Sequence, residues 1–411
     1  MHLHKCPPLS GDSEGSMTTT LVTGATGYLG GYGLVEMLGA APERRFVLLV
    51  RAKDEADARR KLWQGLQLHL NEAAFLEALK RIELVPADLT APRLGLGGQV
   101  RERLAGEVTR IVHAAASLNR RSETACLNVN QRGTLQLLDF AQSVAKRQQL
   151  ERFVYVSTVA VAGQRQDVCI REDEPLDFGR RDYDPYARSK KFGETMVATL
   201  LAGESIAVLR PSIVMGDSRF AATTQFDMVQ AFVAMAELPL LPLDPSVRLD
   251  IVNADYVGRA IAALHGAATL PESTFHASAG AAAPTIGSIT AALSRALGKR
   301  PPRCVAPLAQ PTGRLVDAAN ALLPRRLSPR ILRLLNAFWP YLTNNAVFDN
   351  HRLAAHFALR PAPFTDYCGD LYRYARRHHF TYPAKPYPAA ANVLSLPNPA
   401  AGQAQPIASA R

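Results

Sequence analysis

TTLVTGATGYLGG, residues 19–31, joins a short apolar run to a glycine-rich turn and then to a helical pattern. Gly24, Gly27 and Gly30 form the spacing G-x-x-G-x-x-G. Glycine at such positions permits a sharp turn, close approach of a pyrophosphate to the backbone, and tight packing of helix against strand. A helix beginning here directs free N–H groups and its positive dipole end at an anion. The stretch predicts a strand over 19–24, a helix over 28–40 and a nucleotide site between them.

The same alternation continues along the chain. Apolar runs at 45–51, 82–88, 110–116, 152–158 and 206–212 are each separated by helix-like sequence. Such a pattern predicts a buried parallel sheet covered on both faces. We expect an α/β fold, a Rossmann-type doubly wound parallel sheet, with a smaller and mostly helical C-terminal substrate-binding domain. The expected division is a flexible leader (1–18), a Rossmann domain (19–215), a substrate-binding region interleaved with it (216–382) and a disordered, Ala- and Pro-rich tail (383–411).

The end of the second predicted strand indicates which dinucleotide binds. NAD sites usually place an acidic residue there for the ribose 2′-hydroxyl, whereas this strand ends in Arg51, with Lys53 nearby. Cations suit the 2′-phosphate of NADP, so NADPH is the expected cofactor. Asp88 ends the third predicted strand, where its side chain could bond the adenine amino group. Ala114 and Ala115 are small enough to let the cofactor approach the next strand closely.

Composition says less than these motifs about the class of protein. The net charge of +11 fits a polyanionic ligand, a membrane surface or nucleic acid, and the positive excess lies mostly in the last third. The five cysteines are far apart, and no histidine has metal-ligand spacing, which indicates a reducing, cytoplasmic setting and no metal site. The basic and apolar segment 325–342 could cover an acyl chain, rest on a membrane or form a buried helix. No nucleic-acid partner is expected.

DPYARSKKFGE, residues 184–194, places Tyr186 four residues before Lys190. On a helix this spacing puts both side chains on one face. The spacing alone also fits an ordinary surface helix, so its meaning depends on the surrounding motifs.

Those motifs resemble the extended short-chain dehydrogenase/reductases, and most closely their thioester reductase and fatty acyl-CoA reductase ("male sterility") group. The resemblance covers roughly 19–280. It rests on VTGATGYLG, LLVRAKD, ELVPADLTAPRLGL, IVHAAASLN, NVNQRGT, YVSTVAVAG, YARSKKFGE, LRPSIVMGD and LDIVNADYVGRAI, in that order.

The resemblance implies roles for particular residues. Tyr186 and Lys190 match the catalytic pair, Thr158 matches the catalytic hydroxyl, and Asn130 matches an asparagine that supports the active-site helix. Lys190 would lower the phenol pKa and hold the nicotinamide ribose, while Thr158 would hydrogen-bond the substrate carbonyl. The expected cofactor contacts, besides those already named, are Thr26, Tyr28, Leu29, Leu89, Pro211, Ile213 and the Tyr186/Lys190 pair itself.

The implied activity is NADPH-dependent reduction of an acyl thioester, from acyl-CoA or an acyl-carrier protein, to an aldehyde or onward to an alcohol. Two alternatives remain open at this point. The same residues would serve a reductase or dehydrogenase that acts on a ketone, a hydroxysteroid-like substrate or a sugar nucleotide. A non-catalytic NADP-binding regulator would use only the scaffold, and the intact Thr158, Tyr186 and Lys190 set argues against it.

Overall fold

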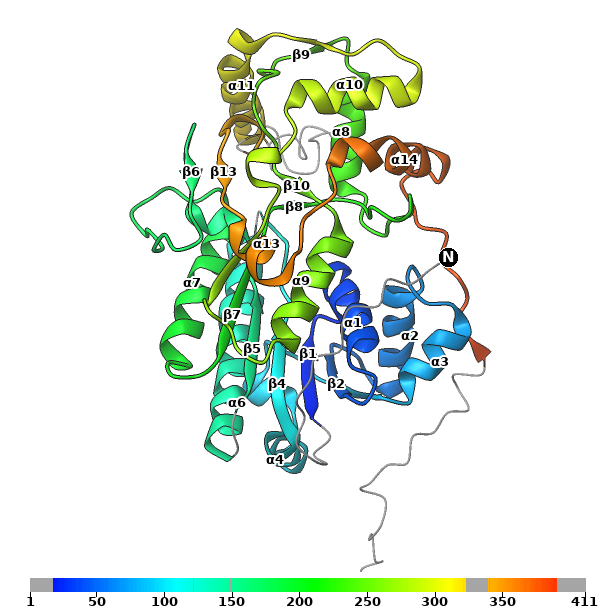
Figure 1. Cartoon of the computed structure of the whole chain (residues 1–411), viewed down its shortest axis with the longest axis vertical. Coiled ribbons are helices and arrows are strands. Elements are labelled where there is room, and N and C mark those ends of the chain that lie inside the picture. The colour runs from blue at the N-terminus through cyan, green and yellow to red at the C-terminus, as the bar shows by residue number, and fades with distance from the viewer. Residues whose placement is uncertain (1–17, 121, 148–149, 323–338, 340, 390–411) are drawn as a thin grey trace, which may run out of the picture.

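The computed structural model describes residues 18–120, 122–147, 150–322, 339 and 341–389 (Figure 1). Its centre is a sheet of seven strands in the order β11-β7-β5-β4-β1-β2-β3, and every neighbouring pair is parallel. The strands are β1 (Thr19–Thr23), β2 (Arg45–Val50), β3 (Ile82–Pro86), β4 (Val108–His113), β5 (Arg152–Val156), β7 (Ile206–Pro211) and β11 (Thr274–Ala277). The order reverses between β1 and β4, which is the arrangement of a doubly wound sheet. The predicted fold class is confirmed.

Helices cover both faces of this sheet (Figure 1). One apolar cluster joins the strands to α1 (Tyr28–Ala40), α2 (Glu55–Leu66), α3 (Glu72–Leu79) and α9 (Ala254–Gly266). A second cluster joins them to α4 (Gly98–Glu107), α6 (Gly133–Arg147) and α7 (Pro185–Leu200). Burial of the strands from both sides explains why they are continuous apolar runs rather than alternating ones.

A smaller, mostly helical region lies above the carboxyl ends of the strands (Figure 1). It contains α8 (Asp227–Glu237), α10 (Ile286–Leu297), α11 (Ala309–Leu322), α13 (His351–Phe357) and α14 (Phe364–Arg377). Helices α8, α10 and α14 share a third apolar cluster. Thr285 caps α10 by accepting a hydrogen bond from the Ser288 N–H at 3.1 Å.

Two-residue strands link this region to the sheet and to itself. They are β6 (Cys169–Ile170), β8 (Ile213–Val214), β9 (Leu240–Leu241), β10 (Ile251–Val252), β12 (Arg303–Cys304) and β13 (Val347–Phe348), paired as β10 with β8, β12 with β9 and β13 with β6. The short helix α5 (Glu123–Cys126) and a π-helical turn (Leu127–Arg132) precede α6. β11 and α9 lie beyond residue 215 yet complete the main sheet and its cover.

Three expectations concern the N-terminal leader, the C-terminal tail and the basic segment. Residues 1–17 of the predicted leader, residues 390–411 of the predicted tail, and 325–338 and 340 of the basic segment lie outside the described residues. The predicted tail starts too early. The backbone N–H of Lys385 donates to the Gln67 side chain at 2.5 Å and its carbonyl accepts from the Trp63 indole at 3.2 Å, so 383–387 pack on α2 despite their composition.

At the described end of the basic segment, Leu342 is buried and Trp339 packs against the third apolar cluster. These two side chains therefore pack against the rest of the protein. In the described ranges, no helix is both long and apolar enough to cross a membrane. Cys126, Cys169, Cys304 and Cys368 are all free thiols.

Candidate active site

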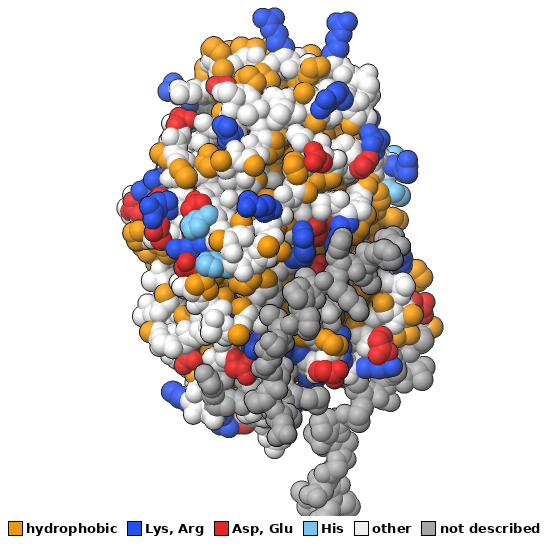
Figure 2. Space-filling model, in the orientation of Figure 1, with side chains coloured by type: hydrophobic (Ala, Val, Ile, Leu, Met, Phe, Trp, Pro, Cys, Tyr) orange, Lys and Arg blue, Asp and Glu red, His pale blue; other side chains and the backbone are white. Residues whose placement is uncertain are grey.

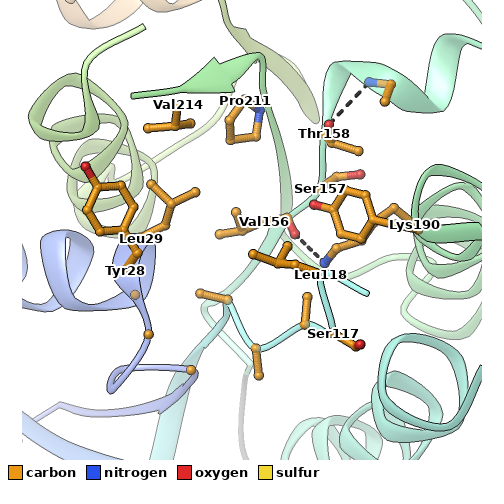
Figure 3. Close-up of a pocket in the computed structure, with 18 of the residues that line it drawn as sticks. Tyr28, Leu29, Ser117, Leu118, Val156, Ser157, Thr158, Lys190, Pro211 and Val214 are labelled. Carbon is orange, nitrogen blue, oxygen red and sulfur yellow. Dashed lines mark hydrogen bonds between the residues drawn. The ribbon is translucent and has the colours of Figure 1, made fainter. Parts of the chain in front are cut away.

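A cavity of about 760 Å³ opens at the carboxyl ends of the strands. Parallel sheets of this topology bind ligands in such a place. Tyr28 and Leu29 lie on one side of the cavity, while Thr158 and Lys190 lie on the opposite side (Figure 3). Pro211 and Val214 close a third side. The glycine loop and the candidate catalytic residues therefore face one space.

The glycine loop has a geometry that only glycine permits. Gly24 has φ +78°, and a Cβ there would lie 2.5 Å from the Ala115 nitrogen. A Cβ on Gly30 would lie 2.1 Å from the Gly24 carbonyl oxygen. Gly27 precedes α1, and no side chain caps the helix. First-turn N–H groups thus remain for an anion, so the loop fits a dinucleotide pyrophosphate.

Arg51 follows β2 and lines the same cavity, as does Lys61, but Lys53 does not. Lys61 already has partners within the protein, because its ammonium lies 2.8 Å from Asp57 and donates to the Arg51 carbonyl at 2.8 Å. Asp88 also lines the cavity, and its carboxylate accepts two hydrogen bonds of 2.8 Å from Thr90. These bonds lower the pKa of the Asp88 carboxyl and keep it an acceptor.

Lys190 is almost fully buried one helical turn after Tyr186. Its ammonium donates to the Val156 carbonyl at 2.7 Å (Figure 3) and lies 4.5 Å from the centre of the Tyr155 ring. Burial lowers the pKa of Lys190 to about 7, against the opposing charge of Glu194. The residue can therefore change its protonation state near neutral pH.

Thr158 lies just beyond β5, where its hydroxyl accepts a hydrogen bond from the Ala160 N–H at 3.3 Å (Figure 3). That bond caps a short 3₁₀ turn (Val159–Ala162) and fixes the side chain at the cavity wall. Its hydroxyl proton stays available to a substrate oxygen, because the hydroxyl acts as the acceptor in this bond.

Tyr186 is buried at the second position of α7, a helix capped by Asp184, which accepts from the Ala187 N–H at 2.7 Å. Burial raises the pKa of Tyr186 to about 12, and the positive charge of Arg120 opposes that rise. The Arg120 guanidinium lies 5.2 Å from the ring centre of Tyr186. Lys190 was expected to lower this pKa, but the cation in contact with the ring is Arg120.

Arg120 and Tyr341 are among the cavity residues that sequence reasoning missed. The Arg120 guanidinium donates to Asp184 at 2.7 Å and to the Tyr341 hydroxyl at 2.6 Å. Tyr341 also stacks on Tyr183 with ring centres 4.4 Å apart. Both Arg120 and Tyr341 line the cavity. The only sequence signal for Arg120 was its place just after IVHAAASLN, and Tyr341 is brought in from a remote segment.

Asn130 supports the site without lining the cavity. Its side-chain amide donates to the Ser117 carbonyl at 3.0 Å and to the Ser189 hydroxyl at 2.9 Å, and its oxygen accepts from the Ser117 N–H at 2.7 Å. Asn130 thus joins the loop after β4 to α7. Asn130 is a positioning residue, because its contacts are to Ser117 and Ser189.

A buried ion pair joins α7 to strand β7 of the sheet. Arg210 of β7 and Glu194 of α7 approach to 2.6 Å, and the Ser157 hydroxyl donates to the same carboxylate. Because Glu194 follows Lys190 by one turn, this pair fixes the helix that carries Tyr186 and Lys190.

The predicted site residues thus converge, with two exceptions. The residues that line the cavity are Gly24, Thr26, Gly27, Tyr28, Leu29, Gly30, Arg51, Asp88, Leu89, Ala114, Ala115, Thr158, Tyr186, Lys190, Pro211 and Ile213. The predicted residues that do not line it are Lys53 and Asn130.

Outside the cavity, Glu172, Asp349 and His351 come close enough for their ligand atoms to lie within 4.8 Å of one another. The sequence did not predict this cluster. Glu172 accepts from the backbone N–H groups of His276 and Arg352, and His351 lies 2.8 Å from Asp349. These contacts explain the cluster as a local network that pins α13 to β11.

The chain matches the model of a known family over residues 22–261, and that family is described as male sterility protein. The fold is similar to the terminal R domain from the myxalamid PKS-NRPS biosynthetic pathway, with a TM-score of 0.72 and 26% identity. That match covers 91% of this chain and 94% of the other. The reductase domain of a nonribosomal peptide synthetase from Mycobacterium tuberculosis shares the fold, with a TM-score of 0.65 at 22% identity, over 89% of this chain and 92% of that one.

Among curated proteins, the chain is 32% identical over 222 residues to isonitrile lipopeptide synthase of Mycobacterium tuberculosis. It is 31% identical over 263 residues to aldehyde reductase lnaA of Aspergillus flavus. The matches cover 50% and 61% of this chain but only 8% and 24% of those proteins, so this chain corresponds to a small part of each. The family match spans more than half of the chain and includes the glycine loop, Thr158, Tyr186 and Lys190. The chain therefore belongs to the male sterility protein family.

Proposed function

We propose that the protein is an NADPH-dependent reductase of an acyl group held as a thioester on phosphopantetheine, either in CoA or on a carrier protein. The observation that carries the proposal is the single cavity. It joins the glycine loop to Thr158, Tyr186 and Lys190. Its lining also includes residues from later in the chain, which are Gln225, Met228, Arg248, Asp250, Tyr341, Asn344, Ala346 and Phe348.

Arg51 supports NADPH over NADH. Its side chain lines the cavity next to the end of β2, where the adenine ribose of a bound dinucleotide lies in folds of this kind. A guanidinium fork matches a phosphate group well, whereas it gains little from a 2′-hydroxyl.

The cofactor, when bound, supplies a hydride for the carbonyl carbon of the thioester. The residues of the chain then act on the carbonyl oxygen. The Thr158 hydroxyl and the Tyr186 phenol donate hydrogen bonds to it, and Tyr186 gives its proton as negative charge develops. Arg120 makes Tyr186 a stronger acid. The resulting hemithioacetal collapses to an aldehyde and a free thiol.

The donor of the thioester, a carrier protein or CoA, is proposed from the relatives and from the charge of the protein surface. The relatives include a synthase and a domain of a nonribosomal peptide synthetase, and the solved myxalamid domain is terminal in a PKS-NRPS pathway. Lys and Arg side chains project from the upper end of the molecule (Figure 2), where Lys299, Arg300, Arg303 and Arg314 are exposed near α10 and α11. A surface of this sign suits an acidic carrier protein or the phosphates of CoA.

The test uses purified protein, NADPH and acyl-CoAs of graded chain length, together with the same acyl groups on pantetheine. Free thiol, aldehyde and NADPH oxidation are measured in parallel. The proposal expects all three in equal amounts with at least one acyl group. Absence of thiol release with every acyl-CoA, acyl-pantetheine and acyl-carrier protein would contradict it.

Reduction of a free aldehyde to an alcohol is the second candidate, favoured by the similarity to aldehyde reductase lnaA. The same cavity and the same three residues would serve. Supplying the aldehyde directly separates the candidates, because NADPH oxidation with aldehyde but not with thioester would favour this second activity.

A further inference from the structure

We propose that Arg248 binds the phosphate group of the phosphopantetheine arm while the acyl group lies against Thr158 and Tyr186. The inference deepens the proposed function and rests on it. It assigns a residue to the end of the substrate that is remote from the reacting carbon.

The first step is a comparison of the cations around the cavity, which are Arg51, Lys61, Arg120, Lys190 and Arg248. Lys61 is paired with Asp57, Arg120 with Asp184, and Lys190 is bonded to the Val156 carbonyl. In the described part of the chain, the side chains of Arg51 and Arg248 have no hydrogen bond or ion pair with the protein. Two guanidinium groups are therefore left to meet a ligand.

The second step is their separation. Arg51 follows β2, whereas Arg248 precedes β10, which pairs with β8, the direct continuation of β7. Strands β2 and β7 are four positions apart in the sheet, which is about 19 Å at the usual spacing of strands. With Arg51 at the adenosine end of the cofactor, Arg248 lies toward the substrate end of the cavity.

The third step is how firmly the backbone holds Arg248. Its N–H donates to the Asn345 side chain at 2.9 Å, and it forms a bridge with Thr285. Val247 and Leu249 on either side are buried, so the extended backbone turns the intervening side chain outward. The guanidinium is thus exposed while its Cα is fixed, which reduces the entropy lost when it binds a ligand.

The chemistry of the phosphopantetheine arm then indicates which of its groups Arg248 binds. Pantetheine itself is uncharged, and its phosphate is the one anionic group common to CoA thioesters and carrier-bound thioesters. A guanidinium binds phosphate through parallel N–H···O bonds, which are among the stronger hydrogen bonds available at a wet surface.

The experiment compares one acyl group on phosphopantetheine and on pantetheine, and uses the ratio of the two kcat/KM values. Wild-type protein is expected to prefer the phosphorylated substrate by about 10-fold, the scale of one charge-assisted contact. Arg248→Gln should bring the ratio to about 1, as expected when the phosphate loses that contact. Arg360→Gln, which changes an exposed arginine outside the cavity and outside the basic group near α10 and α11, should keep the wild-type ratio.

The outcomes separate this inference from the function beneath it. Equal reduction of both substrates by wild type, or an unchanged ratio in Arg248→Gln, would overturn the role of Arg248 while thiol release still supported thioester reduction. Arg248→Gln should lower kcat/KM for both acyl-CoA and acyl-carrier protein. A loss confined to acyl-CoA would assign the residue to the other CoA phosphates and contradict the inference. No thiol from any substrate would instead defeat the proposed function itself.

Discussion

The guanidinium carbon of Arg120 lies 5.2 Å from the ring centre of Tyr186, and the same guanidinium donates a 2.7 Å hydrogen bond to Asp184. Tyr186 thus lies beside an ion pair formed by a cation near its ring and the carboxylate that caps its helix. The two charges act in opposite directions, because Arg120 lowers the pKa of Tyr186 and Asp184 raises it. Burial raises the pKa of Tyr186 more than either charge changes it, and the pair adjusts the acidity of the phenol from there.

Replacing Arg120 by methionine should weaken Tyr186 as an acid. We expect Arg120→Met to lower kcat by about 10-fold, since one pKa unit corresponds to a factor of 10 in acid strength and proton transfer follows it in part. Binding of NADPH should stay within about 3-fold, because a general acid acts in the transition state and not in cofactor binding. Single-turnover rates and a fluorescence titration with NADPH measure the two quantities.

The matched variant is Asp184→Asn. Asparagine keeps the helix cap and removes the negative charge, so the turnover of this variant should equal or exceed that of wild type. Equal losses in Arg120→Met and Asp184→Asn would show that the pair only holds the fold at this place.

Arg51 offers a test of cofactor choice. Arg51→Asp should weaken NADPH binding by about 10-fold or more, because a charge-assisted phosphate contact becomes a repulsion, while NADH binding changes far less. Dissociation constants for both cofactors provide the measurement. Lys53→Asp makes the same change in charge two residues away and outside the cavity, so it should leave the preference near that of wild type. A similar weakening of NADPH and NADH in Arg51→Asp would refute contact with the 2′-phosphate.

Lys190 should make the stability of the cofactor-free protein depend on pH. Its pKa is about 7 when folded, compared with about 10.4 for an exposed lysine. Between these values the unfolded chain binds more protons at this position, so the free energy of unfolding rises as the pH rises. The contribution is complete above the unfolded pKa and is lost as the pH falls to about 7.

Lys190→Met should lack this contribution. Urea unfolding at several pH values between about 7 and 10 should give wild type a slope steeper than that of the variant by about 1 kcal/mol per pH unit. Parallel slopes would mean that the buried amine stays protonated throughout this range.

Much of the fold was readable because each strand is buried on both faces and is therefore an unbroken apolar run. β11 escaped prediction, since TFHA is four residues long and includes a histidine. The glycine loop and the Thr158, Tyr186 and Lys190 set were readable because each follows a strand or opens a helix. Arg120 and Tyr341 were not, because their roles depend on a contact between residues 221 positions apart. Lys53 was assigned by proximity to Arg51, whereas a side chain two positions along need not share its direction.

The measurement that tests the central claim most directly follows hydrogen from the cofactor into the product. Wild-type protein is given an acyl-pantetheine and NADPH deuterated at the transferred position, and the aldehyde is analysed by mass spectrometry alongside thiol release. Thioester reduction predicts one deuterium on the aldehyde carbon and one free thiol for each NADPH oxidised. It also predicts no product from Tyr186→Phe, which still binds NADPH. Thiol released together with a carboxylic acid, without oxidation of NADPH, would mean hydrolysis and would contradict the account.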